Sequence, residues 1–530
     1  MKLFDKILKR NKPDSGNAAI NRTVVNNAFL RGYKAAKMGR LTDDWLTTQI
    51  SINREIRTDI RKVRDRARDS WKNNAYVRAY ALRTRANEVG AEGFSFQSKV
   101  MLKNGNDDER SNKMIEDMWT EWCKKENCTM TGQLNFTRLL WLLDSTLHRD
   151  GEIIVRKITG PSVNKFGFSL ELIEPDALDE TFNMQLANGN VVITGVEIDQ
   201  WKRPVAYWFK KRDPIDELYG ILKTGYQNLV RYPAEEIIFV IDPEHTNQLR
   251  GMSHLAPVLV TLHNIGAYSE AATFNARAGA SKMGFLYNEK GEGEEYEGDE
   301  VDDGGNTITN FASGTIEQLP NGLKFQAFDP TYPNGEFPNF IKSQLREGAA
   351  GLGVQYNSLA NDLEGVNFSS MRSGHIDERD NWMINQTLLR DGLIIPVFET
   401  LLKWALLTGA LALNYADYDR LNKPQFNGRR WSWIDPLKDV QAAVLAIDEG
   451  LSTRTQEAAK QGSDFTEIVK TLSKEIKEAD ENQVVFGQKK DIKTNVTADP
   501  SQDPNAVDGN GDTPANTGNK NYKNKIFKVA

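Results

Sequence analysis

Residues 431–477 constrain the fold of this chain more than any other stretch, because capping residues divide them into three short helices. Asp435-Pro436 begins the first helix, since the aspartate oxygen can accept a free backbone N–H and proline in the first turn costs no hydrogen bond. Apolar residues then recur at helical spacing as far as Gly450, which supplies a left-handed stop. The second and third helices begin at Ser452 or Thr453 and at Asp464. This part of the chain is therefore predicted to form a small helical subdomain.

The rest of the chain changes its hydrophobic period along the sequence. A chain of 530 residues is too long for one hydrophobic core and should divide into several domains. Helical periodicity comes first, over residues 41–89, 107–128 and 135–150. Short β runs follow at 152–157, 169–173, 191–198, 205–209 and 237–241. The predicted fold class is therefore α+β.

Helical periodicity returns after His254, to about residue 282, and again over 339–352 and from about 373 to 413. Pro396 should kink the last of these helices, because proline removes a backbone donor and its ring clashes with the preceding turn. The ends of the chain are polar and lack periodicity. They predict a mobile arm over residues 1–40 and a disordered tail over residues 483–530.

Cysteine usage and hydropathy bear on the compartment. Cys123 and Cys128 fall on one predicted helix, with a spacing that does not suit a CxxC redox or zinc motif. Two reduced thiols in a cytosolic protein are the simplest interpretation. The longest apolar run, residues 401–413, is interrupted by Lys403 and is too short to cross a bilayer. We therefore expect a soluble intracellular chain with no membrane partner.

Motifs for catalysis are missing from the sequence. It contains no phosphate-binding loop of the G-x-x-x-x-G-K type, no H-E-x-x-H and no G-x-S-x-G. His245, His254 and His263 are nine residues apart, so successive members lie on roughly opposite helix faces and do not predict a shared metal site. The acidic run 289–303 lacks the ligand register of an EF-hand loop. We therefore expect no enzyme activity, no cofactor and no metal.

Charge is distributed unevenly along the chain, whose formal net charge is −6. Residues 54–85 are rich in arginine, whereas every charged residue of 289–303 except Lys290 is acidic. Such a chain can bind nucleic acid through its basic face, or it can pair its unlike ends with copies of itself. Composition does not decide between these two interpretations.

Several motifs resemble the lambda-type portal protein family of tailed phages, and they occur in the order of that family. The resemblance covers roughly residues 40–480. Its segments are R-D-G-E at 149–152, Q-L-R-G at 248–251, G-A-A-G-L-G-V-Q-Y at 348–356, N-F-S-S-M-R-S at 367–373, and W-S-W-I with D-P-L-K-D-V-Q-A-A from 431 onward.

The resemblance implies a portal-type fold with an α/β wing, a helical stem, a small α/β clip, a long kinked helix and a helical crown. The corresponding segments are wing 41–253 with a strand region at 411–435, stem helices 254–282 and 339–352, clip 283–338, tunnel loop 353–372, long helix 373–410 and crown 436–482. The acidic insertion in the clip departs from the lambda protein. The family's clip contacts are therefore the part of the resemblance that applies least to this chain.

The resemblance also implies a function. A phage portal is a ring-shaped channel at one capsid vertex, through which double-stranded DNA is packaged and ejected. The implied partners are further copies of the chain in a cyclic homo-oligomer of twelve, the DNA, terminase, a head-completion adaptor, and the major capsid and scaffold proteins. The implied location is the virion, after assembly in the host cytoplasm. The candidate tunnel-loop residues are Asn361, Glu364, Gly365, Asn367, Ser369, Ser370 and Arg372, and the candidate clip residues for partner docking are Glu292, Glu294, Glu295, Asp299 and Glu300.

Two other classes of function stay open on the residues alone. The first is a metal-dependent DNA-processing enzyme whose scattered carboxylates bind Mg²⁺, although no motif supports it. The second is a DNA-binding structural scaffold that uses the basic segment 54–85. A mass measurement in solution separates a portal from both, because only the portal forms large rings.

Overall fold

A computed structural model describes residues 47, 49–211, 228–280, 284–288, 300–301, 307–308, 323–327, 335–365, 367–431, 436–462 and 464–482. The predicted arm over 1–40 and tail over 483–530 lie outside these residues. The chain divides into two compact units, one of residues 1–452 with 460–462 and one of 453–459 with the residues from 463 onward. In the described part of the chain, no helix has both the length and the apolar character that crossing a membrane requires.

The first described helices are α2 (Ile52–Asn73) and α3 (Ala75–Thr84), followed by a π-helical turn (Arg85–Val89). The sequence predicted one helix here, but Asn74 is extended and interrupts it. Its side chain accepts hydrogen bonds from the backbone N–H groups of Tyr76 and Val77, at 3.0 and 3.2 Å, and so begins α3 as an N-cap. Gly90, with φ of +78°, ends the helical run as predicted.

Three further helices precede the first sheet: α4 (Glu109–Trp122), α5 (Lys125–Cys128) and α6 (Phe136–Asp150). The prediction that Cys123 and Cys128 share one helix is wrong. Lys124 is extended, with φ of −67° and ψ of 151°, and separates α4 from α5.

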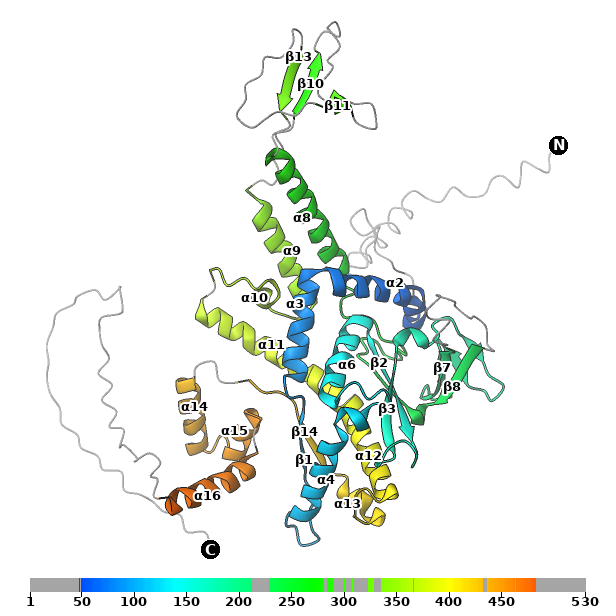
Figure 1. The fold of residues 1–530 in the computed structure, drawn as a ribbon, viewed down its shortest axis with the longest axis vertical. Helices are drawn as coiled ribbons and strands as arrows, with labels where there is room; N and C mark the ends of the chain where they lie inside the picture. Colours follow the sequence, from blue (N-terminus) through cyan, green and yellow to red (C-terminus); the bar gives the residue numbers. More distant parts are fainter. Residues whose placement is uncertain are drawn as a thin grey trace, which may run out of the picture. The chain divides into compact units, whose positions relative to one another are not determined.

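A three-stranded antiparallel sheet has the order β3 (Phe168–Ile173), β2 (Glu152–Thr159), β9 (Ile237–Ile241). Ile154 of β2 lies opposite Ile173 on one side and Phe239 on the other. Helix α6 and the later helix α12 (Ile395–Thr408) lie beside this sheet (Figure 1). The largest core cluster fills the space between them and includes Trp122, Phe168 and Leu401, all fully buried.

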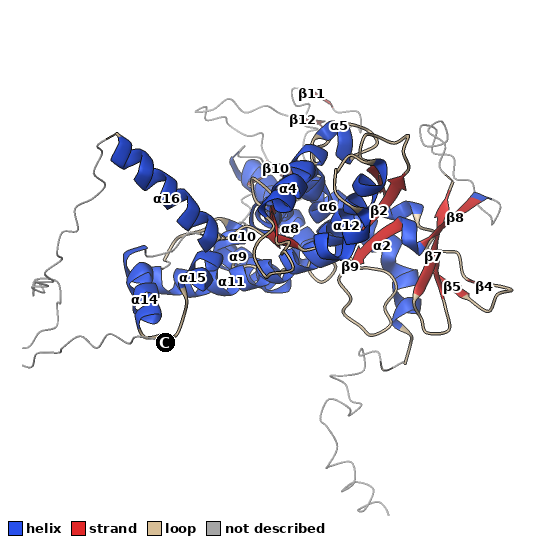
Figure 2. Cartoon of the chain, turned by 90° about the horizontal axis from the view of Figure 1, so that it is seen from below, coloured by secondary structure: helices blue, strands red, loops and turns tan. Residues whose placement is uncertain are grey.

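A second antiparallel sheet has five strands in sequential order (Figure 2). They are β4 (Met184–Gln185), β5 (Val191–Ile193), β6 (Val196–Ile198), β7 (Pro204–Lys210) and β8 (Leu229–Pro233). The predicted run 191–198 is a hairpin, because Thr194 and Gly195 take positive φ values of 48° and 83° and reverse the chain. Strands β4 and β8 were not predicted.

Two helices pack side by side as α8 (Leu259–Ala280) and α9 (Phe337–Gly351) (Figure 1). Leu262 and Ile265, on the predicted apolar face of α8, are buried in a second core cluster with Leu345 of α9. Between the two helices, β10 (Gly284–Asn288) pairs with β13 (Leu323–Ala327), and β11 (Glu300–Val301) pairs with β12 (Thr307–Ile308).

The predicted long helix is present as α11 (Phe368–Leu389), a π-helical turn (Arg390–Ile394) and α12. The irregular turn lies directly ahead of Pro396, where the missing proline N–H interrupts regular helix pairing. Before α11, α10 (Tyr356–Ala360) is a single short helix. The remaining short elements are β1 (Ser95–Ser98), which pairs with β14 (Pro424–Asn427), α13 (Tyr418–Leu421), and the 3-10 turns Pro175–Ala177, Ala234–Glu236 and Tyr415–Asp417.

The three helices predicted from capping residues are α14 (Pro436–Asp448), α15 (Arg454–Lys460) and α16 (Phe465–Glu481). Thr453 forms the cap of α15, because its Oγ1 accepts from the N–H of Gln456 at 3.1 Å and the Gln456 side chain accepts from the N–H of Thr453 at 3.0 Å. Helix α14 belongs to the first compact unit, and α15 and α16 belong almost wholly to the second. The mixed helix-and-sheet class is confirmed, whereas the division into wing, stem, clip and crown stays a prediction.

Candidate functional site

The turn between α10 and α11, residues 361–367, is the exposed part of the predicted tunnel loop; Val366 lies outside the described residues. Asn361 ends α10 in the left-handed conformation, with φ of 52°. Gly365 also has a positive φ, 67°, and open space around it. The Leu363 side chain is 66% exposed although it is apolar.

Hydrogen bonds hold both ends of this turn. Asp362 accepts from the hydroxyl of Tyr356 at 2.7 Å and pairs with the ammonium group of Lys342 on α9 at 3.2 Å. Its other oxygen accepts from the backbone N–H of Glu364 at 2.9 Å. That backbone bond, then the bonds from Tyr356 and Lys342, lower the pKa of Asp362 to about 2. The carboxylate is therefore ionised throughout the neutral range and fixes the start of the turn.

The segment before the turn is packed rather than free. The Asn381 side chain of α11 donates to the carbonyl of Gly353 at 3.0 Å. Ser358 of α10 donates to Glu378 of α11 at 3.0 Å. A Cβ atom on Gly374 would lie 2.6 Å from the Gln355 side chain, so α10 and α11 approach closely there. Among the described residues of the predicted loop 353–372, the turn is the longest exposed stretch.

The other tunnel-loop candidates lie in or beside α11. Asn367 caps this helix, because its side-chain oxygen accepts from the N–H of Ser370 at 2.8 Å. Ser370 is exposed in the first turn, and Ser369 is a helical residue whose side chain lies outside the described part. Arg372 donates to Asp439 of α14 at 2.6 Å, so its charge is paired. The structure therefore places Glu364 and Gly365 in the turn and Arg372 in an ion pair away from it.

The clip candidates cannot be placed in the same way. Glu292, Glu294, Glu295 and Asp299 lie outside the described residues. Glu300 is in β11 and is paired in register with Ile308. Their role in partner docking stays a prediction.

Two sequence motifs that lie almost 100 residues apart meet in a buried ion cluster. Arg250 donates to both oxygens of Glu152, at 2.6 and 2.8 Å, and both side chains are fully buried. Arg64 of α2 donates to the same carboxylate at 3.1 Å. The cluster therefore connects α2, strand β2 and the segment that leads into α8.

Glycines allow the backbones of these motifs to approach. A Cβ atom on Gly251 would lie 1.9 Å from the carbonyl oxygen of Gly151, and one on Gly151 would lie 2.4 Å from the backbone of Met252. The N–H of Gly251 also donates to Glu152 at 2.9 Å. No larger residue fits at either position without moving the backbone.

Neighbouring carboxylates extend the cluster. Arg64 and Arg68 both donate to Asp176, and Arg68 also donates to Asp150. Burial acts to raise the pKa of Asp150, but hydrogen bonds from Arg149 and Arg68 outweigh it and hold that pKa below its ordinary value. Two arginines of the basic segment 54–85 are thus committed to internal ion pairs and are not available to DNA.

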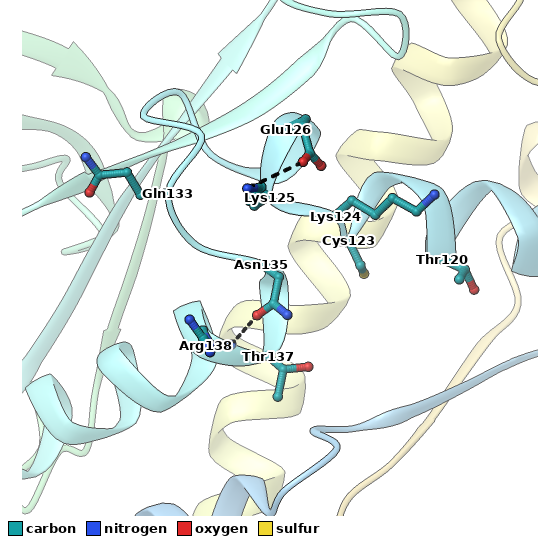
Figure 3. Close-up of a pocket in the computed structure, with 9 residues that line it drawn as sticks. All are labelled: Thr120, Cys123, Lys124, Lys125, Glu126, Gln133, Asn135, Thr137 and Arg138. Atoms are coloured by element: carbon teal, nitrogen blue, oxygen red, sulfur yellow. Dashed lines mark hydrogen bonds and ion pairs between the residues drawn. The ribbon is translucent and has the colours of Figure 1, made fainter.

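A hollow of about 560 Å³ lies between the end of α4 and the start of α6 (Figure 3). Cys123 lines it, but burial raises the pKa of this thiol well above its ordinary value, so the thiol is protonated and unreactive. Asn135 caps α6 there by accepting from the N–H of Arg138 at 2.9 Å. The lining includes no histidine and only one carboxylate, that of Glu126, so it offers no catalytic pair.

Among the residues that the structure describes, one group of side chains could hold a metal ion, and the sequence did not predict it. Glu88, Asp144 and His148 are fully buried, and each offers one ligand atom within 4.8 Å of the others. Asp144 and His148 are four residues apart on α6, which puts them on one helix face. That spacing was the one sign of the site in the sequence. Glu88 lies 56 residues before Asp144, so nothing in the sequence placed it beside the other two residues. The prediction that the chain binds no metal can therefore be tested at this cluster.

Comparison with known proteins gives related sequences across most of the chain. The family described as "Phage portal protein, lambda family" matches residues 38–386. A probable portal protein of Halomonas phage phiHAP-1 is 34% identical over 452 residues, which cover 84% of this chain and 86% of that protein. Portal protein B of Escherichia phage lambda is 29% identical over 136 residues, covering 24% and 26% of the two chains. Among solved structures, a chain in the neck of an empty GTA particle has a TM-score of 0.41 at 13% identity, over 76% of this chain and 93% of that one.

Proposed function

This chain belongs to the lambda family of phage portal proteins, and from that membership we propose that its copies form a closed ring whose channel conducts double-stranded DNA. The turn 361–367 between α10 and α11 is the proposed channel wall. We further propose twelve copies per ring, located at one vertex of the virion capsid after assembly in the host cytoplasm. The proposal assigns no catalytic step to the chain.

The observation that carries the proposal is the charge of the turn and its surroundings. No lysine or arginine occurs between Arg346 and Arg372, whereas Asp362 and Glu364 lie in the turn. Each phosphate that a protein cation neutralises adds salt-dependent affinity for DNA. Lys342 of α9 reaches the turn, but its charge is paired with Asp362. A channel wall whose cation is paired in this way lets DNA slide, because no ion pair with phosphate has to break at each step.

The geometry of the turn also supports contact with a moving polymer. Asp362 fixes the start through Lys342, and Asn367 fixes the end as a helix cap. Between them, a Cβ atom added to Gly365 would meet nothing within 4 Å, and Leu363 is largely exposed. A short span held at both ends can shift locally as DNA advances while the helices stay in place.

Partners other than DNA follow from the family alone. We propose that terminase and a head-completion adaptor dock on the clip, residues 283–338, and that the major capsid and scaffold proteins surround the ring. The acidic residues Glu292, Glu294, Glu295, Asp299 and Glu300 are the proposed docking groups. Removal of 292–303 should leave rings intact and impair docking.

A charge reversal in the turn tests the channel assignment. Glu364→Lys adds a phosphate-binding cation to every subunit of the ring, so it should slow DNA packaging strongly without reducing ring yield. Asp117→Lys, at an exposed position on α4, is the matched control and should package normally. The measurement is DNA packaged per shell, beside a count of assembled rings. Equal packaging by the two variants would remove the turn from the channel wall.

A further inference from the structure

A buried polar cluster lies where α3, α6 and α11 meet. His148 of α6 has its Nε2 atom 2.9 Å from an oxygen of Glu88 and 3.8 Å from an oxygen of Asp144. Glu88 belongs to the π-helical turn after α3, and its other oxygen accepts from Asn385 of α11 at 2.7 Å. All three ligand atoms lie within 4.8 Å of one another, and all three residues are fully enclosed.

Asp144 has an unusual environment for a carboxylate. Its side chain is fully buried, and its oxygens lie within hydrogen-bond reach of the Glu88 carboxyl group but accept no bond from a nitrogen donor or a hydroxyl group. Burying a carboxylate without a partner is costly, and nearly all buried polar groups in folded proteins are satisfied. Arg85 acts on Asp144 as a positive side chain, but one cation neutralises at most one of the two carboxylates. The guanidinium of Arg85 lies 5.7 Å from the centre of the Trp141 ring. The cluster therefore lacks a positive charge at its centre.

The imidazole of His148 is oriented to supply a ligand. Its Nε2 atom is the ring nitrogen that faces the carboxyl groups of Glu88 and Asp144. Its Nδ1 atom lies 2.9 Å from both the Tyr80 hydroxyl and Nδ1 of His254. The Tyr80 hydroxyl oxygen or the Nδ1 atom of His254 can accept a hydrogen bond from His148 Nδ1–H. That arrangement leaves the Nε2 lone pair directed at the two carboxylates.

From this geometry we propose that Glu88, Asp144 and His148 bind one divalent transition-metal ion, with Zn²⁺ as its preferred species. Zinc binds imidazole nitrogen and carboxylate oxygen at about 2.0–2.2 Å, so tetrahedral geometry separates adjacent ligand atoms by roughly 3.3–3.6 Å. The observed separations of 2.9 and 3.8 Å need only a small adjustment to meet that range. The ion satisfies the oxygens of Asp144 and replaces the proton that the buried carboxyl groups otherwise share.

The ligand types distinguish among metals. Mg²⁺ and Ca²⁺ prefer oxygen ligands and retain water, whereas an imidazole beside two carboxylates suits zinc or a similar transition metal. Tyr80, His254 and Asn385 hold the ligands from outside, as groups around metal sites commonly do. The ion would thus have a structural role. It would connect the turn after α3 with α6 directly, and with α11 through the hydrogen bond from Asn385 to Glu88.

Metal content is the direct test. The full-length chain is produced in medium supplemented with zinc, or with manganese, then washed briefly with chelator to remove surface ions and analysed by elemental mass spectrometry. We expect about one retained zinc ion per chain, because an enclosed site exchanges slowly. We also expect a higher melting temperature than for chain produced under zinc depletion, since a ligand that binds only the folded state stabilises it.

Asp144→Asn is the informative variant. The substitution keeps the shape of the side chain and removes a buried charge, so the variant should fold, which circular dichroism checks. It should lose both the retained zinc and the zinc-dependent rise in melting temperature. Glu88→Gln serves as a second ligand variant, and His263→Gln, at an exposed histidine, is the matched control that should retain zinc. Less than one ion per several chains in both metal preparations would overturn the proposal. Zinc retention by the Asp144 variant equal to that of the unsubstituted chain would also overturn it, because the ion would then bind elsewhere.

Discussion

Arg250 is fully buried, and both of its bonds to Glu152 depend on its charge. Replacement by methionine leaves the buried Glu152 carboxylate with Arg64 as its only arginine partner, beside the N–H of Gly251, so Arg250→Met should destabilise the fold by about 3–5 kcal/mol. Arg156 is the matched control. It pairs with Glu171 and Glu236 on the surface, so Arg156→Met should cost about 0–1 kcal/mol. Urea unfolding of the two variants checks the difference, and similar losses would contradict a special role for the buried pair.

Two glycines make an opposed pair of predictions. Gly251→Ala places a methyl group 1.9 Å from a backbone oxygen and should destabilise the fold by several kcal/mol, on the order of other overpacking changes. Gly266 lies inside α8 with nothing within 4 Å of the added atom, so Gly266→Ala should stabilise the protein by about 0.5–1 kcal/mol. Melting temperatures should therefore move in opposite directions. Equal shifts would show that the close approach of 151 and 251 is not rigid.

The buried carboxylate Glu88 predicts a pH dependence in the absence of metal. Burial raises its pKa to about 7, from an ordinary value of 4.5 in the unfolded chain. The folded state therefore holds a proton that the unfolded state releases, so this contribution to stability is present below about pH 4.5 and is lost as the pH rises through about 7. Glu88→Gln should flatten that part of the pH–stability curve, measured in chelator. A curve as steep as that of the unsubstituted chain would assign the proton to another group.

Helix caps account for most of the elements that could be predicted. Asp464 and Gly450 mark helix boundaries that the structure confirms, because a cap is a local arrangement within one turn. Strands β1 and β14 were missed as a pair, since each has four residues and Ser95 bonds to a segment more than 300 residues later. The break at Asn74 was missed for a related reason: its side chain also donates to the Leu262 carbonyl, a contact made only in the folded chain.

The candidate sites also divide into those marked by local sequence and those formed only when distant elements pack. The tunnel loop was predicted over 353–372 from the family resemblance, with Gly365 and its polar neighbours as the local sign of a loop, and its role stays a prediction. The pairing of Glu152 with Arg250 and the approach of Glu88 to His148 could not be predicted, because both depend on how distant elements pack. Local chemistry is visible in sequence, whereas a buried cluster drawn from three elements is visible only in the fold.

Asn74 allows a prediction for α3 as a whole. Its side chain satisfies two backbone N–H groups at the helix start, so Asn74→Ala should destabilise the protein by about 1 kcal/mol. Asn73 is the matched control, since its side chain is exposed and bonds only to Asp69 within α2. Asn73→Ala should be nearly neutral in urea unfolding. Equal effects would mean that the cap contributes little beyond ordinary surface bonding.

For the whole molecule, a ring requires heterologous interfaces, in which one face of each subunit meets a different face of its neighbour. The segregated charges of the chain suit such contacts. Purified full-length chain should therefore assemble into particles of one size with a central hole, with twelve copies expected by native mass spectrometry. A chain that stays monomeric at high concentration in low salt would contradict ring formation.

If the turn 361–367 faces the DNA in the channel, a photoreactive group in the turn should cross-link to DNA during packaging. In the test variant, a photoreactive amino acid replaces Leu363, whose side chain is 66% exposed in the turn. In the control variant it replaces Trp201, whose side chain is 72% exposed beside the five-stranded sheet. Shells are illuminated while they package labelled DNA, and the portal subunits are then analysed for attached DNA. The account predicts adducts at position 363 and almost none at position 201. Absence of adducts at 363 in actively packaging shells, or equal yields at both positions, would contradict it.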